Sequence, residues 1–159
     1  QVTIGILCLA GTLLSGYAYY VEVAKEFNKD YQALCDISAY ISCSKVFTSK
    51  YGRGFGVIGE LLGNEHPLNQ PNSVFGAAFY FLLIILGLTK LSSYAAAQHY
   101  LALSSNIMSL YLAYLLYFVL HDFCIICVST YVVNILLTIV TYIRLHAILE
   151  LESKSKKNK

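Results

Sequence analysis

The chain has 159 residues, of which 57% are apolar and only 13% are charged, and its mean hydropathy is +0.60. Soluble domains usually carry about 25% charged residues, so this chain has too few charges to cover a surface that faces water. A chain this rich in apolar and aromatic residues does not stay disordered in solution. Its net charge of +2 is not gathered into one basic patch, which argues against binding of nucleic acid. The composition indicates a membrane protein.

Four apolar stretches reach or approach the roughly 20 residues that a membrane-spanning helix needs. In chain order, spans are predicted at about residues 2–21, 75–91, 100–120 and 123–143. The second stretch is the shortest, so its helix is expected to begin a few residues earlier or to lie nearly upright. The predicted fold is an all-α membrane protein, a four-transmembrane-helix bundle that forms a single integral membrane domain over residues 1–159.

The first two predicted spans are separated by a long polar loop, residues 22–74, and an ordered loop of this length usually carries function. Four spans place both termini on the same side of the membrane. Positive charge is denser in the basic tail, residues 144–159, than in the loop, which favours a cytoplasmic C-terminus. The tail ends in Lys156-Lys157-Asn158-Lys159, which resembles a dilysine signal for return to the endoplasmic reticulum; a plain basic flank explains it equally well.

Two irregular segments interrupt the loop. Residues 51–56 form a glycine-rich turn, which lacks the preceding strand and following helix of a phosphate-binding loop. Asn72 and Ser73 precede the second apolar stretch, and either side chain is expected to cap its helix.

Five cysteines carry the chemical signal: Cys8, Cys35, Cys43, Cys124 and Cys127. Cys8 is alone in the first span and is expected to be a small buried apolar residue. Cys124 and Cys127 open the fourth span, three residues apart on one helical face, where a dithiol or a disulfide fits. The helix N-terminus there would stabilise a thiolate. Asp122 is expected to cap this helix, with Cys124 nearer the aqueous rim and Cys127 one turn deeper.

Cys35 and Cys43 are eight residues apart, and on one straight helix their alpha carbons would be about 12 Å apart, too far for a disulfide. If they pair, the chain must therefore turn between them. A structural disulfide explains this pair as well as a redox role does. The spacing suits zinc poorly, and no metal site is expected.

Two cysteine pairs on one face of the bundle favour a relay by thiol–disulfide exchange. Electrons from a soluble reductase would enter at Cys35 and Cys43. They would reach Cys124 through a transient disulfide, most simply with Cys43. Reduction of the second pair would free Cys127 as a thiolate facing the bundle interior. The final acceptor would then be lipid-soluble, and a quinone fits.

Five segments together resemble the vitamin K epoxide reductase family, closest to its animal members, including their reductase-like paralogue. The resemblance runs from about residue 34 to residue 143. It rests on Leu34-Cys35-Asp36, Ile41-Ser42-Cys43-Ser44-Lys45-Val46-Phe47, Gly52-Arg53-Gly54-Phe55-Gly56, Leu68-Asn69-Gln70-Pro71-Asn72-Ser73-Val74-Phe75-Gly76 and Asp122-Phe123-Cys124-Ile125-Ile126-Cys127. One departure is Tyr51, which stands where those reductases carry a Trp.

The resemblance implies an enzyme of the endoplasmic reticulum membrane with its cysteines facing the lumen. Such an enzyme reduces vitamin K 2,3-epoxide to the quinone, and the quinone to the hydroquinone. No tightly bound cofactor is expected, since vitamin K is the substrate and the cysteines carry the electrons. A thioredoxin-like luminal protein is the expected electron donor, and 4-hydroxycoumarin-type inhibitors are expected to occupy the substrate pocket.

The resemblance also implies a role for each site residue. Cys127 would attack the substrate, Cys124 would resolve the adduct and receive electrons, and Cys35 and Cys43 would form the shuttle pair. Asn72 and Tyr131 would donate hydrogen bonds to the two ring oxygens, where negative charge develops during reduction. The predicted apolar walls are Phe47, Phe55, Phe75 and Phe79, although ordinary core packing explains the last two nearly as well.

Two other functions remain open on the sequence alone. One is a quinone-dependent thiol oxidase, in which the disulfide rather than the reduced quinone is the product that matters. The other is a structural tetraspan protein whose disulfides staple the long loop.

Overall fold

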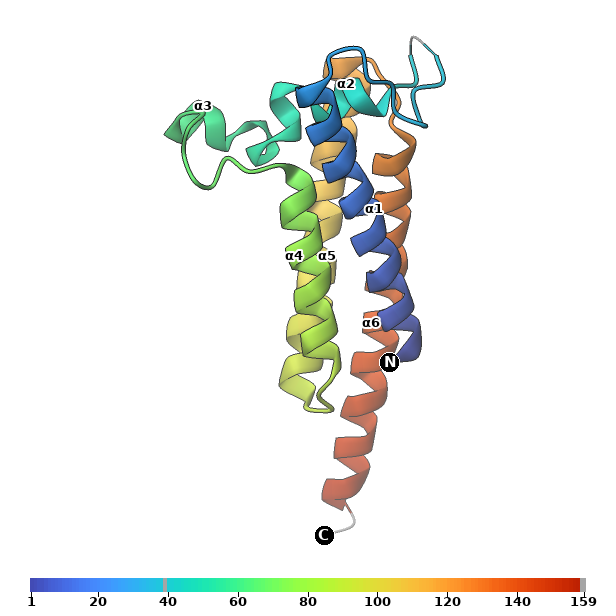
Figure 1. The fold of residues 1–159 in the computed structure, drawn as a ribbon. Helices are drawn as coiled ribbons and strands as arrows, with labels where there is room; N and C mark the ends of the chain where they lie inside the picture. Colours follow the sequence, from blue (N-terminus) through green and yellow to red (C-terminus); the bar gives the residue numbers. More distant parts are fainter. Residues whose placement is uncertain (39, 158–159) are drawn as a thin grey trace.

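The computed structural model describes residues 1–38 and 40–157. Four helices run side by side, and the loop between the first two is gathered at one end of the bundle (Figure 1). The bundle helices are α1 (Val2–Phe27), α4 (Asn72–Gly87), α5 (Ser92–Tyr114), which continues into the π-helical segment η3 (Leu115–Leu120), and α6 (Ile125–Lys157). The loop contains α2 (Cys43–Phe47), η1 (Lys50–Gly52), η2 (Gly54–Gly56) and α3 (Ile58–Leu62). The described residues hold only isolated β-bridges and no strand, so the predicted all-α class is confirmed.

Three helical stretches are long and apolar enough to cross a membrane: α1, Ser92–Leu120 and α6. The helix α4 is apolar but has only 16 residues. At 1.5 Å per residue it is about 24 Å long, against a hydrocarbon core of roughly 30 Å. Three of the four predicted spans therefore have the required length, and α4 has the short length that the sequence indicated.

The helix boundaries differ from those of the predicted spans. The helix α4 covers Asn72–Gly87 rather than 75–91, and α5 begins at Ser92 rather than at residue 100. The helix α6 continues through the predicted basic tail as far as Lys157, and the last two residues of that tail, Asn158 and Lys159, lie outside the described residues.

Buried polar side chains explain two of these differences. Gln98 is fully buried in the first turns of α5, where its Nε2 donates to the carbonyl of Leu83 at 2.7 Å. Arg144 of α6 turns inward and donates to the Gln98 side chain and to the carbonyls of Gly87 and Thr89. A helix can continue through polar residues whose side chains find such partners. An apolar run in the sequence, in contrast, ends at the first charged residue.

The bundle is apolar outside and partly polar inside. Large apolar side chains such as Leu13, Leu110 and Ile143 are exposed on its surface, whereas Ser109, Asn134 and other polar residues are buried. Tyr80 Oη donates to Asn134 Oδ1 at 2.9 Å, and Asn134 Nδ2 donates to Ser109 Oγ at 3.0 Å, linking α4, α6 and α5. Helices that pack within lipid use polar links of this kind. The chain is therefore a helical membrane protein.

Two buried clusters fill the interior. The bundle core contains Cys8, which is fully buried among apolar side chains as predicted. The second cluster joins the loop to one end of the bundle and consists of Val21, Ala33, Cys35, Cys43, Val46, Leu116 and Cys124, with Cys127 packed against it. The cysteines of both pairs therefore meet at the loop end.

Candidate active site

Asp36 folds the segment that carries the loop cysteines. Its Oδ2 accepts from the backbone N–H of Ala33 at 2.8 Å, and its Oδ1 accepts from the N–H of Ser44 and the hydroxyl of Ser42, each at 3.0 Å. Burial of the carboxyl acts to raise the pKa of Asp36, but the hydrogen bonds from Ser44, Ala33 and Ser42 outweigh it, and the pKa lies below its usual value. The carboxylate thus closes this segment into a tight turn.

The turn brings Cys35 and Cys43 into a disulfide with their alpha carbons 5.8 Å apart. The predicted break between them is confirmed. It needs neither proline nor glycine, because the side chains of Asp36 and Ser42 satisfy the freed backbone groups. Ser42 also caps α2, where its Oγ accepts from the N–H of Lys45 at 3.3 Å.

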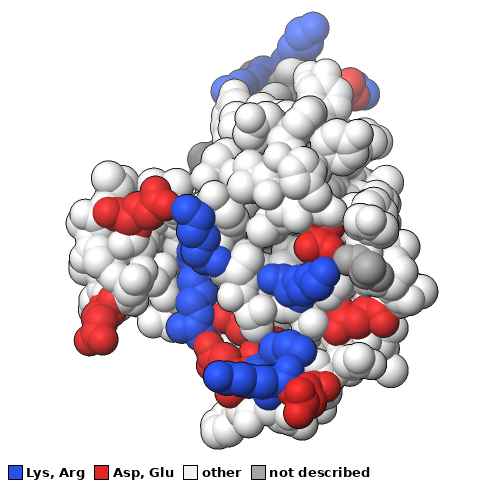
Figure 2. All heavy atoms as spheres, turned by 90° about the horizontal axis from the view of Figure 1, so that it is seen from above, with Lys and Arg blue, Asp and Glu red and all other residues white. Residues whose placement is uncertain are grey.

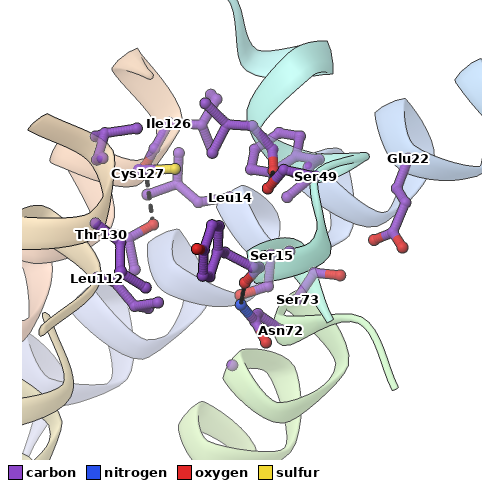
Figure 3. A pocket seen from close by; sticks show the side chains of 18 of the residues that line it. Leu14, Ser15, Glu22, Ser49, Asn72, Ser73, Leu112, Ile126, Cys127 and Thr130 are labelled. Carbon is purple, nitrogen blue, oxygen red and sulfur yellow. Dashed lines mark hydrogen bonds between the residues drawn. The ribbon is translucent and has the colours of Figure 1, made fainter. Parts of the chain in front are cut away.

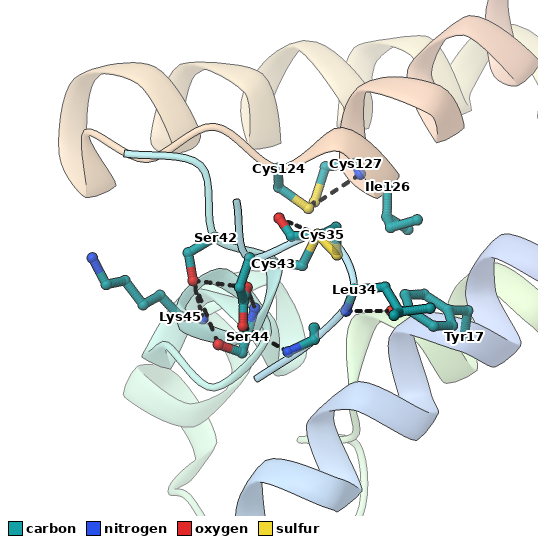
Figure 4. The surroundings of a disulfide bond; sticks show 12 residues. Tyr17, Leu34, Cys35, Ser42, Cys43, Ser44, Lys45, Cys124, Ile126 and Cys127 are labelled. Atoms are coloured by element: carbon teal, nitrogen blue, oxygen red, sulfur yellow. Dashed lines mark hydrogen bonds between the residues drawn. A yellow bond between two sulfur atoms is a disulfide. The ribbon is translucent and has the colours of Figure 1, made fainter. Parts of the chain in front are cut away.

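Two backbone hydrogen bonds dock the disulfide turn onto the segment before α6. The N–H of Phe123 donates to the carbonyl of Tyr40 at 2.7 Å, and the N–H of Ser42 donates to the carbonyl of Phe123 at 3.1 Å. Ile41 and Phe123 pair in a parallel bridge. Each is followed closely by a cysteine, so the pairing sets Cys43 beside Cys124, as Figure 4 shows.

Cys124 lies just before α6 and closes its first turn. The N–H of Cys127 donates to Cys124 Sγ at 3.2 Å, and the N–H of Val128 donates to the Cys124 carbonyl at 3.0 Å. The predicted cap at Asp122 is therefore wrong. Asp122 instead lies 3.7 Å from the ammonium of Lys45 on α2. A thiolate at Cys124 would gain from the Cys127 N–H and the positive end of the helix.

Cys127 faces Cys124 on one side and a cavity on the other. Its Sγ lies 2.6 Å from Cys124 Sγ, and neither sulfur is in a disulfide in this structure. Cys124 is fully buried, whereas Cys127 is partly exposed. The Cys127 side chain thus touches both Cys124 and the cavity.

The cavity has a volume of about 140 Å³ and a mainly apolar lining. Four predicted site residues line it: Cys127, Tyr131, Asn72 and Phe47. In Figure 3, Cys127 lies on one side of the cavity and Asn72 and Ser73 on the other. The structure thus brings together the predicted nucleophile and both predicted hydrogen-bond donors.

The other three predicted aromatic walls lie outside this lining. Phe55 and Phe75 pack on each other with ring centroids 5.2 Å apart, and Phe79 packs against Tyr80 at the same separation. Phe79 also borders the bundle core. Phe79 thus has the core packing that the sequence left open, whereas Phe75 packs on the glycine-rich turn.

The glycine-rich turn, residues 51–56, forms one wall of the cavity with Tyr51 and Gly52. Gly54, Phe55 and Gly56 all have positive φ, of 51°, 57° and 74°. A side chain on Gly56 would collide with the ring of Tyr51, since an added Cβ would lie 2.4 Å from it. Glycine on both sides of Phe55 lets the turn take this left-handed course.

The amide of Asn72 fastens this turn to α4. Its Oδ1 accepts from the N–H of Phe55 at 2.8 Å, and its Nδ2 donates to the carbonyl of Tyr51 at 2.7 Å. The prediction that Asn72 or Ser73 caps α4 is wrong, because the helix begins at Asn72 and its cap position is Pro71.

Arg53 ties the same turn to the end of α1. Its Nε donates to Glu22 at 2.8 Å and its Nη2 to Glu26 at 2.6 Å. Figure 2 shows acidic and basic side chains gathered on this end of the molecule. The Glu22 side chain is only 4% exposed and lines the cavity.

Sequence reasoning missed the contribution of α1 to the cavity, which comes from Leu14, Ser15, Ala18 and Glu22. Their spacing, roughly one and two helical turns, places them on one face of the helix. The sequence signal that could have indicated this face is its small residues and its one acidic residue in an otherwise apolar helix. Among residues 1–38 and 40–157, no three His, Cys, Asp or Glu side chains are placed to bind a metal ion.

A membrane bundle in which a buried disulfide, a dithiol and an apolar cavity adjoin one another has the architecture of a thiol-dependent membrane oxidoreductase. Comparison with known proteins agrees with this class. The model of the "Vitamin K epoxide reductase family" matches residues 2–142. The chain belongs to the vitamin K epoxide reductase family.

Two curated relatives extend the match over most of the chain. The rat protein "Vitamin K epoxide reductase complex subunit 1" (Rattus norvegicus) is 48% identical over 128 residues, which are 80% of each chain. The mouse protein of the same name (Mus musculus) is 46% identical over 139 residues, 86% of this chain and 84% of its own. The chain is accordingly an oxidoreductase of this family.

Proposed function

We propose that this chain reduces vitamin K 2,3-epoxide to the quinone, and the quinone to the hydroquinone. The relatives' names support this substrate. The observation that carries the proposal is the position of Cys127, which lines the apolar cavity while its Sγ lies 2.6 Å from Cys124 Sγ. A cavity of this lining suits a lipid-soluble ring, and the dithiol supplies two electrons.

Electrons reach the cavity through two thiol–disulfide exchanges. A donor dithiol reduces Cys35–Cys43, and the freed Cys43 thiolate attacks Cys124 in the oxidised helix pair, releasing Cys127. Cys35 then attacks Cys43, which restores the loop disulfide and leaves Cys124 reduced. The backbone hydrogen bonds of Phe123 with Tyr40 and Ser42 support this route, because they hold Cys43 beside Cys124.

In the cavity, the Cys127 thiolate attacks the ring and Cys124 then attacks Cys127 Sγ, so that the electron pair of the broken C–S bond stays with the substrate. Epoxide and two thiols give quinone, water and one disulfide; quinone and two thiols give hydroquinone and one disulfide. Tyr131 and the second N–H of Asn72 donate to the ring oxygens, where charge develops. Phe47 packs against the ring.

The proposal includes the placement of the chain in the membrane. Spans α1, α4, α5 with η3, and α6 form a single four-span domain in the endoplasmic reticulum membrane. The loop of residues 22–74, with Cys35 and Cys43, faces the lumen, and the basic tail of residues 144–159 faces the cytoplasm. A thioredoxin-like luminal protein supplies the electrons, and 4-hydroxycoumarin-type inhibitors compete for the cavity.

The test is anaerobic turnover of vitamin K epoxide by the purified chain in detergent with a dithiol donor. Wild type and Cys8→Ala are expected to form quinone and hydroquinone, and Cys127→Ala is expected to form neither. Turnover that survives in Cys127→Ala overturns the mechanism. Reduction of quinone without reduction of epoxide supports a quinone-dependent thiol oxidase instead, and no reduction of either supports a structural role.

A further inference from the structure

Ser73, the second residue of α4, has a hydroxyl without a hydrogen-bond partner among the described residues. The residue lines the cavity beside Asn72. Its Oγ is shielded from solvent and has no hydrogen-bond partner among the residues that the structure describes. Nearly all buried polar atoms have a partner, and an exception at a cavity wall indicates that something bound there supplies one.

The position of Ser73 in its helix explains why the hydroxyl stays free. Serines inside a helix commonly donate to a carbonyl three or four residues earlier. Ser104 and Ser105 of α5 do so, to Leu101 and Ala102 at 2.8 and 2.7 Å. Ser73 is preceded by Pro71 and the irregular end of the loop rather than by a helical turn. The carbonyl of Gln70, three residues earlier, accepts from Gly54 instead.

The neighbouring Asn72 has little donor capacity left. A side-chain amide has two N–H donors and one carbonyl acceptor. The carbonyl and one N–H are engaged with the glycine-rich turn. On the α4 side of the cavity, the Ser73 hydroxyl is thus a second donor beside the remaining N–H of Asn72, and it has no partner among the described residues.

We infer that Ser73 Oγ donates a hydrogen bond to a ring oxygen of the bound quinone or epoxide, on the side of the cavity opposite Cys127. This inference rests on the proposed function and adds a substrate-contacting residue to it. Ser73 then joins the remaining N–H of Asn72 at one ring oxygen while Tyr131 addresses the other, which orients the ring between α4 and α6. The hydroxyl stabilises the negative charge that develops on its oxygen during reduction.

The test compares Ser73→Ala with Ser73→Thr, which keeps the hydroxyl, and with Ser104→Ala, which removes a serine hydroxyl from α5 outside the cavity. The probe is 2-methyl-1,4-naphthoquinone with a ¹³C-labelled carbonyl, bound to the oxidised chain without donor. Infrared difference spectra report the carbonyl stretch, which a donated hydrogen bond lowers. Titration gives the Kd, and thermal unfolding without ligand reports stability.

Ser73→Ala is expected to bind the probe about ten-fold more weakly, the loss of roughly one hydrogen bond, with the carbonyl stretch at higher frequency. Its unfolding temperature without ligand should equal or exceed that of wild type, because no protein contact is lost. Ser73→Thr and Ser104→Ala should match wild type in all three measurements.

An unchanged Kd and an unchanged carbonyl band in Ser73→Ala overturn the inference. A lower unfolding temperature with unchanged binding also overturns it, because the hydroxyl would then stabilise the fold rather than bind the substrate. If wild type itself reduces no epoxide and binds no quinone, the proposed function fails. If wild type does both and Ser73→Ala equals it, only the assignment of Ser73 fails.

Discussion

The side-chain amide of Asn72 joins two elements that are far apart in sequence. Its partners, Tyr51 and Phe55, precede it by 21 and 17 residues. Sequence alone indicated a helix cap or a substrate donor. The structure adds a third role, in which Asn72 holds the wall of the cavity in place. Loss of this side chain therefore affects the shape of the site as well as its chemistry.

Asn72→Ala is expected to lower both turnover and stability. Two backbone groups of the glycine-rich turn lose their partners, at a cost of about 1–3 kcal/mol. Thermal unfolding and limited proteolysis of residues 51–56 check this. The control is Asn28→Ala, because the Asn28 side chain accepts locally, from the N–H of Asp30. An unchanged unfolding temperature with lost turnover would show that Asn72 acts on the substrate alone.

Asp36 makes the disulfide turn sensitive to acid. Because its pKa is lowered in the folded chain, its stabilising effect is complete above about pH 4, the unfolded value. The effect is lost as pH falls through the lower, folded pKa. Proteolysis of the turn by an acid-stable protease should therefore be slow and constant from pH 7 to 5 and accelerate below about pH 4.

The matched variants for Asp36 separate this carboxyl from acid effects elsewhere. Asp36→Asn should be cleaved faster than wild type from pH 7 to 5, with no further acceleration in acid, because an amide accepts less strongly than a carboxylate from the three donors. Asp30→Asn, an exposed change on the same loop, should behave as wild type. Equal pH profiles for wild type and Asp36→Asn would contradict this role.

At this scale, spacing and residue type predicted the cysteine pairs, and the family resemblance predicted Asn72 and Tyr131 at the cavity. The two pairs, Tyr131 and Asn72 were all identified, because a C-x-x-C motif and a familiar set of short segments carry local information. The hydrogen-bond partners of Asn72 and the free hydroxyl of Ser73 could not be predicted. They depend on contacts between segments separated by many residues.

Among the elements, the glycine-rich turn depends on Arg53 for its attachment to α1. The Glu22 carboxylate that accepts from Arg53 is almost fully buried, so removal of the guanidinium would leave a buried charge without its cation. Breaking a fully buried pair costs about 3–5 kcal/mol. The Arg53 side chain is 42% exposed, so the cost is expected to be smaller, about 1–3 kcal/mol after allowance for solvent screening.

Arg53→Gln is expected to lower the unfolding temperature and to weaken quinone binding, because the turn moves away from α1. Glu22→Gln combined with Arg53→Gln should recover part of the stability, since no unpaired carboxylate remains. Lys50→Gln is the control, as its pair with Glu60 is exposed on both sides. Additive losses in the double variant, measured as a double-mutant cycle, would argue against direct coupling.

Apolar run length located the four bundle helices, although several helix ends differ from the ends of the predicted spans. The sequence places the start of the third span at about residue 100, because the second half of the uncharged run is its more apolar part. Gln98 is nevertheless buried with its own partner. A count of apolar residues cannot distinguish a polar side chain that faces lipid from one that is satisfied inside the bundle.

On the scale of the whole molecule, Arg144 joins three helices at the end away from the cysteines. Its guanidinium donates to Gln98 of α5 and to the carbonyls of Gly87 and Thr89, at and just beyond the C-terminal end of α4. The guanidinium of arginine holds five N–H donors in a rigid planar fork that can reach three separated acceptors, whereas the lysine ammonium is a compact point charge. This contact satisfies carbonyls that the short helix α4 leaves without helical partners.

Arg144→Lys should therefore lower the unfolding temperature in detergent almost as much as Arg144→Gln. Lys154→Gln, on the exposed end of α6, should have little effect. Turnover per folded molecule should stay near that of wild type in Arg144→Lys, because the cavity lies at the other end of the bundle. Full stability in Arg144→Lys would mean that the charge alone, rather than the fork, holds the helices.

The whole account depends on electrons passing from the loop pair through the helix pair to the cavity. Its most direct test is a single-turnover count. The chain is fully reduced, freed of donor and mixed anaerobically with vitamin K epoxide, and products and disulfides are then quantified together by mass spectrometry.

The relay predicts that four thiols deliver about two electron pairs, the first with oxidation of Cys124 and Cys127 and the second with oxidation of Cys35 and Cys43. Cys127→Ala should deliver none. Product formed without loss of thiols, or a single electron pair with Cys35 and Cys43 still reduced, would contradict the account.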